Sequence, residues 1–167
     1  MSVEIAILNA LHVNMGYKRG ENVVVIAQRW SEQVGEEKRA AIERSHNVAR
    51  LMHETFLTEG VDSRLVEYDV TEPRNGADAP ANVYEEAGSP DVMFMPTAYS
   101  LTHTPFRQFL TERGARVASM PTFTRQMFEK GGPMDVDYEE VGHVTHEIAE
   151  RLRASRYVRV TAPGTYI

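Results

Sequence analysis

The stretch 22–28 reads Asn-Val-Val-Val-Ile-Ala-Gln, a short apolar run dominated by β-branched side chains. Such a run is typical of a strand that is buried on both faces of a sheet. Comparable short segments follow at 61–68, 91–95, 115–119 and 156–161. Because helical patterns separate these segments, we expect them to pair in parallel through right-handed crossovers.

Apolar residues at helical spacing mark the segments between the predicted strands. Three predicted helices cover 3–15, 36–59 and 80–87. A fourth begins at the cap Thr104 and ends at Gly114, a brief fifth begins at Thr122 or Thr124, and the last begins at Asp137. The sequence therefore predicts an α/β, doubly wound fold, with a mostly parallel sheet of about five strands and helices on both faces. We expect residues 1–167 to form a single domain, since the length is close to ~150 residues per domain.

The composition restricts the classes of protein to which the chain can belong. Its 167 residues include no cysteine, which excludes disulfides, thiolate zinc sites, iron–sulfur clusters and a cysteine nucleophile. The net charge of −6 argues against nucleic acid or an anionic membrane surface as a partner. No apolar stretch approaches the ~20 residues that span a bilayer, and no signal peptide is visible, so we expect a cytoplasmic protein.

The predicted carboxyl ends of the strands are where a sheet of this kind binds its ligands. These ends carry no Gly-x-Gly-x-x-Gly for a dinucleotide and no phosphate-binding Gly-x-x-x-x-Gly-Lys-Ser/Thr. They also lack the acidic cluster of a phospho-acceptor domain and the Gly-x-Ser-x-Gly of a hydrolase elbow. The commonest functions of the architecture are therefore disfavoured.

His103 is the leading candidate for chemistry, because it follows a predicted buried strand and precedes a predicted helix N-terminus. A histidine in this position can contact a ligand and can act as acid or base near neutrality. Hydroxyl groups crowd the same loop, and we expect them to bind substrate: Thr97, Tyr99, Ser100, Thr102 and Thr104. The alternative is a polar strand-to-helix turn whose hydroxyls only cap the helix.

Other polar clusters carry weaker signals. His143 and His146 share one helix face and could contact one metal, but their spacing is a weak zinc signal and a solvated face is favoured. The acidic run 135–140 is adequately explained by helix capping. His46 and His53 are expected on a surface stripe of the long helix. No metal site is predicted from these residues.

Several segments together resemble a known family. They are Thr97–Thr104 (TAYSLTHT), Gly114–Pro121 (GARVASMP), Asp137–Glu139 (DYE), Asn14–Val24 (NMGYKRGENVV) and Val158–Thr165 (VRVTAPGT). In these motifs the chain resembles the N-terminal part of the thermophilic metallo-aminopeptidases, the leucyl aminopeptidase T-like proteins. The ring-cleaving 2,5-dihydroxypyridine dioxygenases are similar to that family and share the motifs, so the resemblance does not separate the two branches.

The resemblance implies an incomplete enzyme. Members of the family are about twice as long, and their metal ligands lie in a C-terminal domain that would begin about where this chain stops. No cofactor is therefore expected in this chain, although a divalent metal (Zn, Co or Fe) is implied for the full-length family. His103 matches the motif histidine of the family. In the dioxygenase branch, the resemblance makes that histidine an acid–base residue facing the metal-bound substrate, and we carry this role to His103 for a complete active site.

Two hypotheses follow. In the first, the chain forms one wall of an aminopeptidase-like active-site cleft, acts on a peptide or small-molecule substrate, and is not catalytic alone. It would then be part of a homo-oligomer or pair with a C-terminal catalytic half. In the second, it is a small-ligand-binding or oligomerisation domain, or part of a dioxygenase-like ring-cleaving enzyme.

Overall fold

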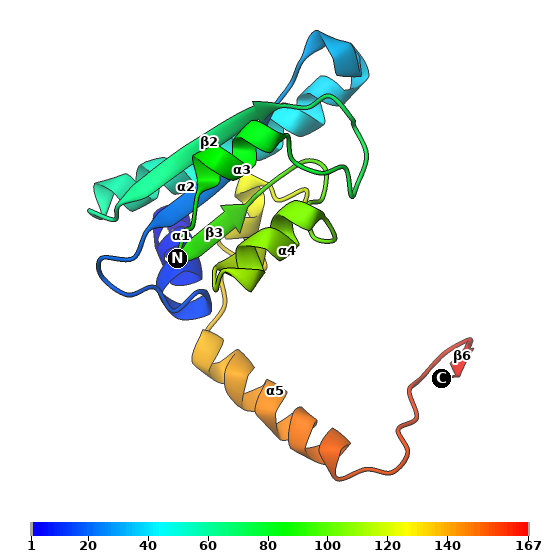
Figure 1. Cartoon of the computed structure of the whole chain (residues 1–167). Helices are drawn as coiled ribbons and strands as arrows, with labels where there is room; N and C mark the ends of the chain where they lie inside the picture. The colour runs from blue at the N-terminus through cyan, green and yellow to red at the C-terminus, as the bar shows by residue number, and fades with distance from the viewer. Residues whose placement is uncertain (1, 167) are drawn as a thin grey trace. The chain divides into compact units, whose positions relative to one another are not determined.

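The computed structural model describes residues 2–166 and divides the chain into two compact units (Figure 1). The first unit ends at Asp135, and the second begins at Val136. The first unit holds the sheet and most of the helices, and it contains every residue of the predicted substrate-binding loop.

Four parallel strands form the sheet of the first unit, in the order β2-β1-β3-β4. The strands are β1 (Val23–Arg29), β2 (Ser63–Asp69), β3 (Val92–Met95) and β4 (Arg116–Ser119). β1 is central, since Val25 pairs with Leu65 of β2 on one side and with Phe94 of β3 on the other. The predicted doubly wound α/β fold is thus confirmed, with four strands in the parallel sheet instead of five.

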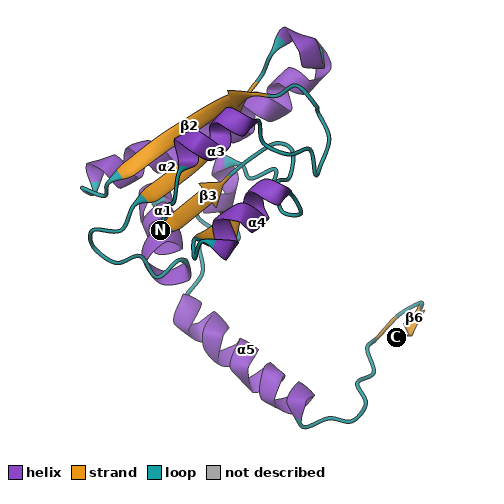
Figure 2. Cartoon of the chain, viewed as in Figure 1, coloured by secondary structure: helices purple, strands orange, loops and turns teal. Residues whose placement is uncertain are grey.

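Helices cover both faces of this sheet (Figure 2). One layer contains α1 (Val3–Asn9), its π-helical continuation η1 (Ala10–Asn14) and α2 (Arg39–Thr58), while α3 (Ala81–Ala87) and α4 (Pro105–Glu112) form the other. Short 3₁₀ turns lie at η2 (Glu32–Val34), η3 (Glu36–Lys38) and η4 (Arg125–Phe128). Among residues 2–166, no helix combines the length and the apolar character needed to cross a membrane.

The apolar run of β1 explains why two layers can form. Successive side chains of a strand point to opposite faces, so Val23 and Val25 join the core beneath α1 and α2. Val24 and Ile26 instead join the core beneath α3 and α4. Burial on both faces is what a continuous apolar strand predicts, and it fixes β1 at the centre of the sheet.

The second unit contains α5 (Tyr138–Arg153) and a small antiparallel pair, β5 (Thr161–Ala162) with β6 (Thr165–Tyr166). Asp137 caps α5 as predicted, since its Oδ1 accepts hydrogen bonds from the backbone N–H groups of Glu139 and Glu140.

The predicted fifth strand of the parallel sheet, 156–161, is wrong. Residues 156–160 are exposed and belong to no strand, and Thr161 pairs antiparallel with Tyr166. The β-branched residues Val158 and Val160 gave the segment its strand-like pattern. That pattern has no structural consequence without a neighbouring strand, because β propensity depends mainly on burial and cross-strand packing.

Candidate functional site

The carboxyl ends of the four parallel strands meet at one edge of the sheet. From β1 the chain first adds β2 on one side, then crosses back to add β3 and β4 on the other. The loops after β1 and β3 therefore leave in opposite directions, and this divergence point is where doubly wound sheets bind ligands. The segment Pro96–Thr104, which follows β3, lies at this point.

Gln28 connects the segments that meet where the loops after β1 and β3 diverge. Its side chain is only 3% exposed and comes from the last part of β1. Gln28 Nε2 donates to the Tyr68 hydroxyl (2.6 Å) and to the carbonyl of Tyr99 (3.3 Å), and Gln28 Oε1 accepts from the backbone N–H of Tyr99 (3.0 Å). Burial raises the pKa of Tyr68 to about 12, so its phenol stays neutral in the folded protein. One amide thus joins β1, β2 and the loop after β3.

A row of hydroxyl groups continues along that loop. The Ser100 and Thr102 hydroxyls lie 2.8 Å apart, and the Thr102 and Ser119 hydroxyls lie 2.7 Å apart. Arg107 of α4 donates from Nε to the carbonyl of Thr102 (2.9 Å). These contacts fix the loop between the end of β3, the end of β4 and the first turn of α4.

His103 lies between two hydrogen-bonded threonines, Thr102 and Thr104, but makes no such contact itself. It is exposed, and its imidazole makes no hydrogen bond or ion pair with residues 2–166. The following residue, Thr104, is buried and caps α4, since its hydroxyl accepts from the N–H of Arg107 (3.3 Å) and donates to the carbonyl of Leu101 (2.8 Å). A held loop therefore presents a free imidazole.

The other predicted substrate-binding residues have different surroundings. Thr97 is fully buried, and its hydroxyl has no hydrogen-bond partner within the residues that the structure describes. Tyr99 is half-buried and packs against a small apolar cluster that includes Val34, Ile42 and Ala98. Ser100 and Thr102 are brought together, whereas the Thr104 hydroxyl is already used by the helix cap.

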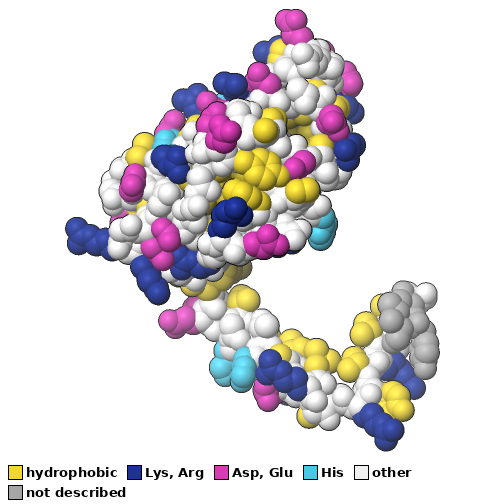
Figure 3. Space-filling view, viewed as in Figure 1, with side chains coloured by type: hydrophobic (Ala, Val, Ile, Leu, Met, Phe, Trp, Pro, Cys, Tyr) yellow, Lys and Arg dark blue, Asp and Glu magenta, His cyan; other side chains and the backbone are white. Residues whose placement is uncertain are grey.

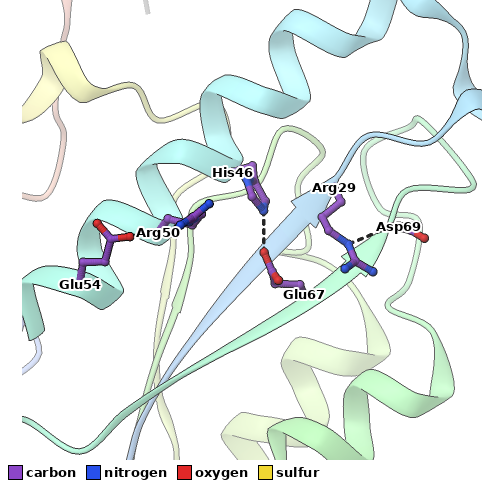
Figure 4. A network of polar contacts seen from close by, with 6 residues as sticks. All are labelled: Arg29, His46, Arg50, Glu54, Glu67 and Asp69. Atoms are coloured by element: carbon purple, nitrogen blue, oxygen red, sulfur yellow. Dashed lines mark hydrogen bonds and ion pairs between the residues drawn. The ribbon is translucent and has the colours of Figure 1, made fainter. Parts of the chain in front are cut away.

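Charged pairs around β2 form a separate network (Figure 4). His46 Nε2 of α2 lies 2.6 Å from Glu67 Oε1, and Arg29 Nε lies 2.9 Å from Asp69 Oδ1. His53 Nδ1 lies 3.0 Å from the Ser63 hydroxyl, and burial lowers the pKa of His53. The two histidines of α2 thus attach the helix to β2, a role that their helical spacing alone did not reveal.

The residues considered for a metal do not come together. His143 and His146 are both exposed on α5. In the described part of the chain, no three His, Asp or Glu side chains are grouped so that they could hold a metal ion.

Two hollows that share the lining residues Arg44 and Thr124 lie on the α2 side of the same edge. One has a volume of about 100 Å³ and is lined by Arg44 and Ser45 of α2, by Ala98 and by Thr122. The other, of about 240 Å³, shares Arg44 and continues along α2. Sequence analysis missed these residues, because α2 and the loop after β4 are about 80 positions apart. The signal that was available is Arg44, a charge on α2 with no acidic residue one turn away.

No family model, no curated protein and no solved structure matches this chain. The kinship with the leucyl aminopeptidase T-like proteins therefore stays a prediction, carried by the sequence motifs alone.

Proposed function

We propose that this chain forms one wall of the active site of a metal-dependent, aminopeptidase-like hydrolase, with His103 as its acid–base residue. The observation that carries the proposal is the state of His103, an exposed imidazole without polar contacts to residues 2–166. Its loop is held by hydrogen bonds of Tyr99 and Thr102 before it and of Thr104 after it. An imidazole in this state is free to exchange a proton with a substrate, and its loop does not need to reorganise.

The hydroxyl row beside His103 supplies the second part of the proposal. The hydroxyls of Ser100, Thr102 and Ser119 form a hydrogen-bonded chain. Their O–H groups can donate a hydrogen bond to a substrate oxygen. The substrate is a peptide or another small molecule with a carbonyl group. A ring-cleaving enzyme like the 2,5-dihydroxypyridine dioxygenases is the alternative, because both branches share the motif around His103.

The proposal requires a complementary half that supplies the metal ligands for Zn, Co or Fe. Support for association comes from α5, whose apolar residues Val141, Val144, Ile148 and Leu152 are each about half exposed. A C-terminal catalytic half or a second copy of the chain would cover this stripe. The net charge of −6 argues against nucleic acid or an anionic membrane as a partner. The proposed location is the cytoplasm.

The test uses the chain tagged in its own cells and purified with whatever binds it. The assembly is supplied with Zn²⁺, Co²⁺ or Fe²⁺, and hydrolysis of an aminoacyl anilide and cleavage of a dihydroxypyridine ring are measured. We expect His103→Ala to lower kcat by ~10²–10⁴, the usual contribution of a positioned acid or base. His12→Ala, which alters another exposed histidine, is the matched control and should leave kcat unchanged. Full activity of the His103→Ala assembly would remove His103 from the mechanism.

A further inference from the structure

A hollow with both polar and apolar walls, the latter including Ala41 and Phe123, lies between α2 and the loops that follow β3 and β4. Arg44 and Ser45 line it from α2, Ala98 from the loop after β3, and Thr122 and Thr124 from the loop after β4, around about 100 Å³. Arg44 and Thr124 also line the neighbouring hollow of about 240 Å³. Neither hollow is lined by a described acidic residue, although the chain as a whole is acidic. The local chemistry therefore differs in sign from that of the whole chain.

Arg44 differs from the other arginines of α2. Arg39 pairs with Glu43, and Arg50 pairs with Glu54, each four residues further along the helix. At the corresponding position Arg44 has Val48, and it makes no ion pair or hydrogen bond with residues 2–166. Its guanidinium is therefore an unpaired cation on a residue that lines the hollow, with five N–H groups available to an acceptor.

Two hydroxyls of the hollow also lack partners. Ser45 is only 2% exposed, and its hydroxyl makes no hydrogen bond to any residue that the structure describes. Thr124 begins η4, but its side chain makes no capping hydrogen bond. Among the described residues, only the Thr97 hydroxyl is a fully buried side-chain group without a partner, so the Ser45 oxygen keeps some exposure. Since Ser45 lines the hollow, its hydroxyl is available to a ligand there.

Backbone strain points to the same place. Thr122 has φ +61°, the one positive φ among the described residues other than glycine. A β-branched residue in the left-handed region is a genuine outlier, and such strain concentrates at ligand sites. The strained turn is held by a hydrogen bond of 2.7 Å from the Thr122 N–H to the carbonyl of Thr97, next to Ala98 in the wall of the hollow.

We propose that this hollow binds a compact oxyanion, the carboxylate or phosphate group of a small ligand. Arg44 supplies the charge and the paired N–H donors that match an oxyanion, and the Ser45 and Thr124 hydroxyls donate from the walls. The larger hollow takes the body of the ligand, between Leu51 on α2 and Gln126 on η4. Of the residues that line the two hollows, Ala98 alone belongs to the His103 loop, and it has no part in the proposed proton transfer. The oxyanion proposal therefore does not depend on the proposed enzymatic function.

The experiment is a titration of the ¹⁵N-labelled chain followed by NMR, with inorganic phosphate and with acetate as separate probes. Both probes are taken to about 20 mM, which reveals a dissociation constant near 1 mM. Sodium chloride at equal ionic strength is the reference, because it reports screening alone. We expect saturable shifts at Arg44, Ser45 and Thr124 with at least one probe, and the probe that binds tells phosphate from carboxylate.

Matched variants test whether Arg44 and Ser45 bind the anion. Arg44→Gln should weaken binding at least tenfold, whereas Arg50→Gln, which removes an exposed charge two turns along the same helix, should leave it unchanged. Ser45→Ala should weaken binding about threefold without unfolding the chain, since it removes one hydroxyl hydrogen bond of ordinary strength. The absence of saturable shifts with both probes, or equal losses in Arg44→Gln and Arg50→Gln, would overturn the proposal.

Discussion

The helices α2 and α5 have similar amphipathic patterns, but the apolar residues of α2 are buried and those of α5 are exposed. Ile42, Val48, Met52 and Phe56 of α2 are each 2% exposed or less. The corresponding stripe of α5, formed by Val141, Val144, Ile148 and Leu152, is 46% to 53% exposed. Figure 3 shows such hydrophobic side chains at the surface along the α5 segment.

Chain connectivity explains the difference. α2 lies between β1 and β2, which pair along their whole length, so both ends of the helix are attached to the sheet. α5 follows the last strand of the parallel sheet, and in the part of the chain that the structure describes no further strand joins that sheet after it. A periodic apolar pattern thus predicts that a helix has a face to bury, whereas a return strand determines what buries it.

The largest expected effect tests burial directly. Phe56 is fully buried, with its ring centroid 5.3 Å from that of Phe94 on β3. Phe56→Ala should lower the free energy of unfolding by about 3–5 kcal/mol, because it leaves a cavity in the core. Ile148→Ala on α5 should cost less than about 1 kcal/mol, and urea denaturation measures both. Comparable losses would mean that the α5 stripe is covered in solution.

Alkaline pH should separate buried from exposed tyrosines. Tyr68 has a pKa of about 12 in the folded chain, against about 10 when unfolded. The unfolded state ionises first, so this stabilisation is complete below pH ~10 and is lost as the pH rises towards 12, by at most about 3 kcal/mol. Unfolding free energies measured between pH 8 and pH 11 should fall less steeply for Tyr68→Phe than for the unaltered chain.

Tyr157 supplies the control for this experiment, because it is 86% exposed in the second unit. The Tyr157→Phe chain should keep the alkaline profile of the unaltered chain. A profile that Tyr68→Phe leaves equally unchanged would contradict the burial argument, since the group responsible would lie elsewhere.

The smallest effects concern the two helix caps. Thr104→Ala should lower the unfolding free energy by about 1 kcal/mol, because α4 loses its cap inside the packed unit. Asp137→Ala removes a cap of similar strength from α5. Its effect should appear as faster amide hydrogen exchange in the first turn of α5, with little change in the unfolding of the sheet. A large global loss in Asp137→Ala would show that the two units unfold together.

Much of the fold could be predicted because its signals are local. Within the predicted strands, residues 23–27 and 92–95 are apolar without interruption, and all of them are buried. The helix predicted at 36–59 ends where a glycine follows it: Gly60 has φ +78° and donates a hydrogen bond from its N–H to the carbonyl of Leu57. The error at 156–161 arose because Val158 and Val160 favour a strand locally, while pairing requires a partner that local sequence cannot report.

The candidate site was predictable only in outline. The position of His103 follows from the rule that ligands bind at the carboxyl ends of parallel strands. The contacts that hold the loop could not be read, because Gln28 reaches Tyr68 across 40 positions and Tyr99 across 71. Arg44, Ser45 and Thr122 were missed for the same reason, since they meet only when α2 and the loop after β4 are in place.

The central place of β1 has a consequence for the synthesis of the chain on the ribosome. This strand is synthesised first, yet its partners begin only at Ser63 and Val92. At ~5–20 residues per second, the run Val23–Ile26 leaves the ribosome seconds before β3 exists to pair with it. During that interval the nascent chain exposes an aggregation-prone segment, so its yield in a cell should depend on chaperones that hold newly made chains.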